Sequence, residues 1–180
     1  MEHNAPDLTE LLQKASVEHL TTYRQLVARD FGSVTMIVTT DFEALYAYKH
    51  GDYQRCLQLS TQNVHTLLYG VYIPEIPTFP EFIQLLDDEI VSLTALTLVV
   101  NPKLQYRRVP GKYAFIGQLI LSLYLMTQCQ MKLRHSVTSL AQTLDYIEVT
   151  QRRRPADATL DQLTLKLIKR KVVEYISLSV

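Results

Sequence analysis

The sequence predicts an all-α protein of about seven helices, in which antiparallel helix hairpins pack as a short solenoid or an irregular bundle. Apolar residues recur at spacings of three and four along most of the chain. The 5 glycines among 180 residues leave few places for the tight turns of a β-rich fold. The prolines fall between the amphipathic stretches, where helices must end. We expect a single domain over residues 1–180, with a soft boundary in the proline-rich loop 70–80.

The first expected helix runs from Asp7 to about Phe31. Asp7 and Glu10 have the spacing of a capping box, which satisfies backbone N–H groups at a helix start. A second helix is expected from Ser33 to Lys49. The β-branched residues of 34–40 would also suit a strand, but no second strand lies nearby to pair with it. We therefore expect a helix here as well.

A helix hairpin is expected around Gly51. Two amphipathic stretches meet at residues 49–53, and glycine readily adopts the positive φ that such a bend requires. Asp52 is a good N-cap for a following helix that extends to about Tyr69. The small side chain of Cys56 lies where the two helices should touch.

The remaining helices are separated by proline-containing loops. They are expected over residues 81–100, 113–131, 136–151 and from 159 towards the end of the chain. Thr159 and Gln162 form a capping box at the start of the last one.

The cysteine and hydropathy patterns describe an ordinary intracellular protein. Cys56 and Cys129 both lie in apolar helical patterns, which predicts buried, free thiols. The most apolar runs, Ile90–Val100 and Tyr113–Met126, fall short of the roughly 20 residues that a membrane helix needs. Residues 1–7 have no signal-peptide character. A cytoplasmic location without a membrane span is expected.

Charge is divided unevenly along the chain. Residues 1–100 contain 5 Lys/Arg and 13 Asp/Glu, whereas residues 101–180 contain 13 Lys/Arg and 5 Asp/Glu. The two halves therefore carry net charges of −8 and +8. Such a chain can pair its own halves, associate head to tail, or offer each half to a different partner.

Residues 36–69 resemble a tetratricopeptide repeat, a hairpin of two helices with a glycine turn. The residues that carry the resemblance are Ala44, Gly51, Tyr53 and Cys56. A weaker second match begins at Tyr113. Ser60 and Leu68 depart from the pattern, which has a bulky apolar residue and a proline at these places.

The resemblance implies a surface that binds proteins or peptides. In such repeats, the first helix of each unit lines a concave groove. The side chains that would be exposed there are Asp41, Leu45, Tyr48, Lys49, Gln118 and Ser122. Families of this architecture are seldom enzymes.

Motifs for catalysis, cofactors and metals are not found in the sequence. There is no G-x-S-x-G, and neither cysteine lies beside a glycine turn. The scattered glycines form no phosphate-binding loop, and no histidine pair has the spacing of metal ligands. Asp87, Asp88 and Glu89 are consecutive, so on a helix they point about 100° apart and are expected to form an exposed acidic face. We expect no enzyme activity, no cofactor and no metal.

Basic residues of the second half form a candidate anion-binding surface. They are Arg107, Arg108, Arg152, Arg153, Arg154, Lys169, Arg170 and Lys171. Only Tyr106 accompanies them as an aromatic residue for base stacking, which weakens an RNA-binding interpretation.

The sequence therefore favours a non-catalytic adaptor or scaffold that binds another protein or peptide. The alternative is a binder of RNA or another polyanion through residues 101–180. Self-association through the oppositely charged halves is a third possibility.

Overall fold

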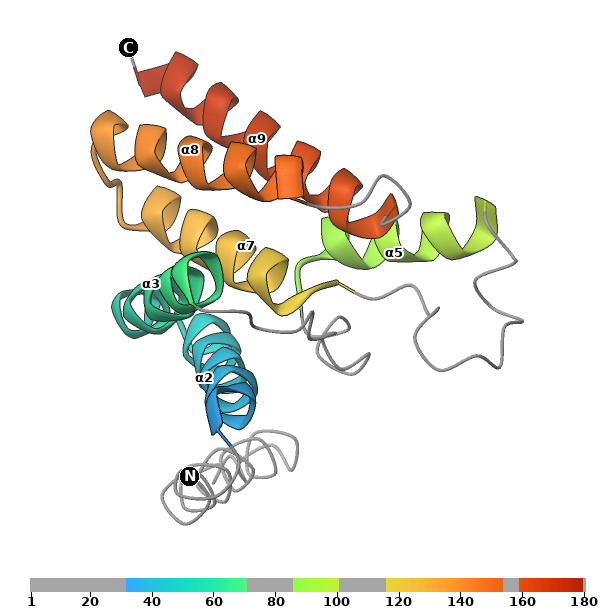
Figure 1. Ribbon diagram of the computed structural model, residues 1–180. Helices are drawn as coiled ribbons and strands as arrows, with labels where there is room; N and C mark the ends of the chain where they lie inside the picture. Colours follow the sequence, from blue (N-terminus) through green and yellow to red (C-terminus); the bar gives the residue numbers. More distant parts are fainter. Residues whose placement is uncertain (1–31, 71–85, 101–115, 154–158, 180) are drawn as a thin grey trace, which may run out of the picture.

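The computed structural model describes residues 32–70, 86–100, 116–153 and 159–179. Within these ranges the chain forms six α-helices and no β-strand, which confirms the all-α class (Figure 1). The helices are α2 (Gly32–Lys49), α3 (Tyr53–Tyr69), α5 (Asp88–Val100), α7 (Gln118–Lys132), α8 (Val137–Arg153) and α9 (Thr159–Ser179). The helix expected over 7–31 and the loops expected over 70–80 and 103–111 lie wholly or largely outside the described residues.

Two predictions about the helices can be judged directly. Residues 34–40 are helical, as expected, because they belong to α2. The helix expected from Glu81 instead begins at Asp88, since Leu86 and Asp87 are not helical. The acidic residues therefore lie at the start of α5 rather than near its middle. Negative charge is favourable there because the N-terminal end of a helix carries partial positive charge.

Helix α7 lies at the centre of the molecule. It packs against α2 and α3 on one side and against α8 and α9 on the other (Figure 1). Residues 120–130 of α7 are all buried, so this helix has no solvent face over three turns. The largest fully buried side chains it contributes are Ile120, Leu121, Leu123, Tyr124, Leu125 and Met126. Burial on all sides means that the polar residues of α7, among them Ser122, Thr127 and Gln128, are buried together with the apolar ones.

The α2–α3 hairpin closes through the expected glycine bend. Gly51 has a φ of 77°. Its N–H donates to the Tyr48 carbonyl at 3.1 Å, and the Asp52 N–H donates to the Ala47 carbonyl at 2.9 Å. This pair of bonds is a Schellman motif, which satisfies carbonyls at a helix end. The Asp52 side chain then accepts from the Arg55 N–H and caps α3, as predicted.

Replacing Gly51 with valine is expected to lower the free energy of unfolding by about 1–2 kcal/mol, because a β-branched residue is strained at positive φ. A Cβ at this position meets no atom within 4 Å, so backbone strain alone should account for the loss. Urea unfolding followed by circular dichroism measures it. Gly51→Asn is the matched control, since asparagine tolerates this conformation and should lose much less. Equal stability of the valine variant and the native chain would contradict this account of the turn.

Two further predictions concern the interior of the hairpin and the absence of a membrane span. Ala44 and Cys56 are fully buried in the hairpin, and the relation of this hairpin to tetratricopeptide repeats stays a prediction. Among the described helices, none has both the length and the apolar character needed to cross a membrane.

Candidate functional site

A group of polar side chains is buried where α2, α3 and α7 meet. Asp41 of α2, Asn63 of α3 and Ser122 of α7 form this group, which we call the Asp41 cluster. The Ser122 hydroxyl donates to Asp41 Oδ1 at 2.6 Å, and the Asn63 amide donates to the same oxygen at 2.9 Å. Asn63 Nδ2 also donates to the Ile37 carbonyl at 3.1 Å. One amide therefore connects α3 to both the backbone and a side chain of α2.

Asp41 is buried, and the described groups that bond to it are uncharged. Both hydrogen bonds fall on Oδ1, whereas Oδ2 has no hydrogen-bond partner among the described residues. Burial raises the pKa of Asp41 from 3.8 to about 7, although the bonds from Ser122 and Asn63 act in the opposite direction. The carboxyl is therefore neutral over a much wider pH range than an exposed aspartate.

A second carboxylate joins α5 to the hairpin and to α7. Asp87 Oδ2 accepts from the Tyr48 hydroxyl at 2.9 Å and from the Tyr124 hydroxyl at 2.5 Å. The Asp87 carbonyl also accepts the first backbone bond of α5, from the Ile90 N–H. Burial raises the pKa of both tyrosines well above the ordinary value, with the Asp87 charge and hydrogen bonds adding to the effect. We call these three residues the Asp87 cluster.

The two thiols also lie in the interface between α3 and α7. Cys56 and Cys129 are buried and free, as predicted. A hydrogen bond with the Cys56 thiol is the largest cause that raises the pKa of Cys129 well above its ordinary value, and burial is the second cause. The Cys56 sulfur also contacts the Ser60 hydroxyl at 3.7 Å. A protonated, buried thiol is a poor nucleophile, so Cys129 has the character of an interior residue.

The sequence predicts that six residues line an exposed groove, and this prediction is wrong for five of them. Those that the structure buries are Asp41, Leu45, Tyr48, Gln118 and Ser122, and only Lys49 is exposed. The reason is that α7 packs directly on the face of α2 that a repeat array would leave open. The structure does bring Asp41 and Ser122 together, but as hydrogen-bonded interior partners.

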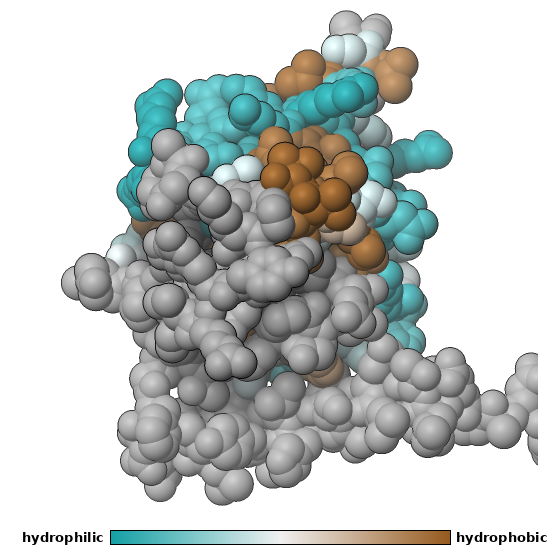
Figure 2. Space-filling view, turned by 90° about the vertical axis from the view of Figure 1, so that its right-hand side faces the viewer, coloured by the Kyte–Doolittle hydropathy of each residue, from teal (hydrophilic) through white to brown (hydrophobic). Residues whose placement is uncertain are grey.

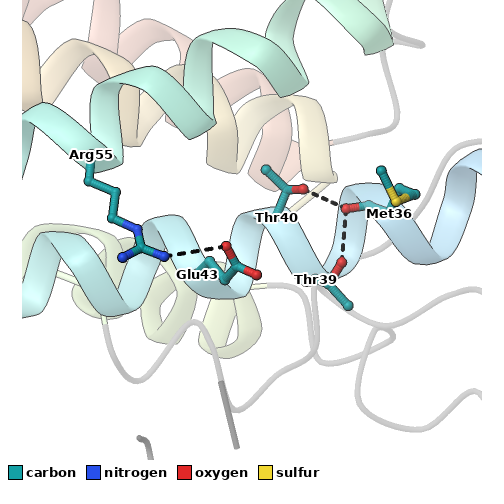
Figure 3. A network of polar contacts seen from close by, with 5 residues as sticks. All are labelled: Met36, Thr39, Thr40, Glu43 and Arg55. Atoms are coloured by element: carbon teal, nitrogen blue, oxygen red, sulfur yellow. Dashed lines mark hydrogen bonds and ion pairs between the residues drawn. The ribbon is translucent and has the colours of Figure 1, made fainter. Parts of the chain in front are cut away.

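Figure 3 shows a further group of polar side chains on α2, of which Thr39, Thr40 and Glu43 are buried. The hydroxyls of Thr39 and Thr40 both donate to the Met36 carbonyl, at 3.1 and 2.7 Å. The Glu43 carboxylate of α2 lies 3.9 Å from the Arg55 guanidinium of α3. The two threonine bonds stay within α2, and the Glu43–Arg55 pair connects α2 to α3.

The described members of the predicted anion-binding surface have partners within the chain. Arg152 and Lys169 both pair with Glu148, at 3.6 and 2.9 Å. The remaining pairs are Arg170 with Glu174, Lys171 with Glu89, and Arg153 with the Leu68 carbonyl. Arg107, Arg108 and Arg154 lie outside the described residues. Surface pairs of this kind contribute little stability, but the carboxylates of Glu148, Glu174 and Glu89 offset part of the positive charge that an anion would need.

The acidic face predicted for residues 87–89 needs a correction. Asp87 points to the two tyrosines instead of to solvent, because it precedes α5 and is not part of it. Asp88 and Glu89 are exposed, and Glu89 forms an ion pair with Lys171 of α9.

Helix α5 carries an exposed apolar face that sequence reasoning missed. Leu96, Val99 and Val100 are 61%, 73% and 80% exposed, and their spacing puts them on one side of the helix. We call these three residues the α5 face. Figure 2 shows hydrophobic surface in the middle of the side of the molecule on which α5 lies. The signal in the sequence was that residues 90–100 are apolar on every side, so a helix packed on one side must expose the rest.

In the described part of the chain, no group of three or more His, Cys, Asp or Glu side chains could hold a metal ion. Comparison of the chain with protein-family models, with curated proteins and with solved structures finds no match.

Proposed function

We propose that this chain is a non-catalytic adaptor that binds another protein through the α5 face. The observation that carries the proposal is the exposure of Leu96, Val99 and Val100 side by side on one helix. Single exposed apolar residues are common on protein surfaces, but a contiguous group is typical of interaction sites. Burying such a group against a partner provides a favourable free energy of roughly 25 cal/mol for each Å² removed from water.

The chemistry of the interior also supports a binding role over a catalytic one. The carboxyls of Asp41 and Asp87 accept hydrogen bonds from side chains of neighbouring helices. A catalytic acid or nucleophile has to reach a substrate, and these buried groups serve to hold helices together.

The alternative of polyanion binding receives less support. The five described basic residues of the predicted surface contact Glu148, Glu174, Glu89 or a backbone carbonyl. An anion would have to compete with each of these partners, so we place the binding role on the α5 face.

We expect the double variant Leu96→Ser and Val99→Ser to lose capture of the partner from native extract by about tenfold or more, because central apolar contacts often contribute over 1 kcal/mol each. The control is Val137→Ser with Val173→Ser, which removes apolar side chains that are 43% and 47% exposed on α8 and α9. Quantitative mass spectrometry of the captured proteins measures the difference. The α5 variant should melt at the same temperature as the native chain.

Two results would contradict the proposal. One is that the α5 variant and the control capture the same proteins in the same amounts. The other is a large drop in the melting temperature of the α5 variant, which would show that the face packs inside the molecule. Loss of self-association instead of loss of a second protein would identify the partner as another copy of the chain.

A further inference from the structure

Asp41 is a buried titratable group at a point where three helices meet. Its carboxyl is fully buried there and accepts hydrogen bonds from Asn63 of α3 and Ser122 of α7. The proposed binding role of the α5 face makes no use of this group. A buried carboxylate normally requires an opposite charge or several donors, because transfer of an ion out of water is costly.

Among the described residues, the groups that donate hydrogen bonds to Asp41 are neutral. From α7, the facing group is the Ser122 hydroxyl, while the titratable Tyr124 and Cys129 of that helix contact Asp87 and Cys56. From α3, the Asn63 amide donates to Asp41, and the Asp41 charge acts on the pKa of the Cys56 thiol.

The nearest other carboxylate on α2 does not change this picture. Glu43 is also buried, and its carboxylate lies 3.9 Å from the Arg55 guanidinium of α3. Among the described residues, no lysine, arginine or histidine forms an ion pair with Asp41. Oδ2, which has no hydrogen-bond partner there, is the oxygen on which a proton would remove the buried charge.

We propose that the α2–α3 hairpin is a pH-sensitive clasp on α7, closed while Asp41 is protonated and loosened when Asp41 ionises. Ionisation places a negative charge at the junction with a single pair of neutral donors on one oxygen. Separation of the hairpin from α7 lets water reach that charge. Of the bonds in the Asp41 cluster, the opening breaks the one from Ser122 of α7, whereas both Asn63 bonds lie within the hairpin and are kept.

The direction of the pH effect follows from the two protonation equilibria. The pKa of Asp41 is about 7 in the closed state, whereas the exposed carboxyl has its ordinary value of 3.8. Between these values the closed form holds a proton that the open form releases, so stability falls as the pH rises. The stabilisation is complete below pH 3.8, and its loss is complete above about pH 7. Within this window the equilibrium constant for opening rises roughly tenfold for each pH unit.

The test is hydrogen exchange of the full chain from pH 5 to pH 8, corrected for intrinsic exchange rates and read by mass spectrometry. Protection of peptides from α2 and α3 should fall by roughly tenfold per unit up to about pH 7, while peptides from α8 should change much less. Asp41→Asn should remove this dependence, because the amide keeps the acceptor and does not ionise. The control Glu43→Gln, on the same helix, should keep it.

A direct measurement decides the case if Asp41→Asn does not fold. The side-chain carbon resonance of Asp41 in the native chain reports its protonation by NMR, and it should titrate near pH 7. Titration near pH 4 would overturn the proposal. So would an equal loss of protection in α2, α3, α8 and α9, which would show global unfolding instead of a local clasp. Neither result depends on the α5 face, so the two proposals fail separately.

Discussion

Asn63→Ala is expected to lower the free energy of unfolding by about 3 kcal/mol, a large effect for one polar residue. The Asn63 amide makes two hydrogen bonds, to the Ile37 carbonyl and to Asp41 Oδ1. Alanine removes both bonds, leaves two buried acceptors with fewer donors, and opens a cavity between α2 and α3. Each of these losses costs on the order of 1 kcal/mol. Urea unfolding monitored by circular dichroism gives the difference.

The neighbouring residue provides the control. Gln62 is exposed on the same helix, so Gln62→Ala should change stability by less than about 0.5 kcal/mol. If both variants lose the same amount, the hydrogen bonds of Asn63 are not the cause.

A second substitution at this position separates hydrogen bonding from cavity formation. Asn63→Asp keeps the size of the side chain but replaces the amide nitrogen that donates to Asp41 with a carboxylate oxygen. Two carboxyls then face one another in a buried site, where both cannot ionise without a large penalty. We expect this variant to be much less stable at pH 8 than at pH 5, whereas the loss in Asn63→Ala should depend less on pH.

The second large effect is expected at the Asp87 cluster. Tyr124→Phe should lower the free energy of unfolding by about 2–3 kcal/mol, because it removes a hydrogen bond to a carboxylate in a mostly buried setting. Tyr48→Phe should lose less, since its bond is longer at 2.9 Å. Tyr69→Phe, at a tyrosine that is 67% exposed, is the control and should be nearly neutral.

The two tyrosines donate to the same oxygen, so their effects should not add. In a double-mutant cycle, we expect the loss of stability in the variant with both Tyr48→Phe and Tyr124→Phe to differ from the sum of the two single losses by more than about 0.5 kcal/mol. Additive losses would show that the hydroxyls act independently and that Asp87 does not connect them. The same measurement tests the correction to the sequence analysis, which had placed Tyr48 on an exposed groove.

Local rules made several features predictable. The positive φ of Gly51, the capping by Asp52 and the helical state of residues 34–40 each depend on residues within one or two turns. The burial of Cys56 and Cys129 followed from their place in apolar stripes. Periodicity also indicated the helices and their approximate ends, apart from the starts of α5 and α7, which begin at Asp88 and Gln118 instead of at residues 81 and 113.

The candidate sites depended on contacts between distant parts of the chain. Ser122 lies 81 residues from Asp41, and Tyr124 lies 37 residues from Asp87, so no spacing rule could pair them. The sequence suggested that Asp41 and Ser122 belong to related positions, yet it placed them on the surface. Only the packing of α7 against the hairpin decided that both are interior.

Backbone geometry and the spacing of apolar side chains are enough to specify the helical class, the hairpin bend and the buried thiols, so these could be predicted from the residues. Which face of each helix is covered depends instead on the packing of distant helices. That packing buried Asp41 and Tyr48, turned Asp87 inward, and left one side of α5 open. The physical reason is that a helix can bury any sufficiently apolar face, and the choice depends on which other helix reaches it.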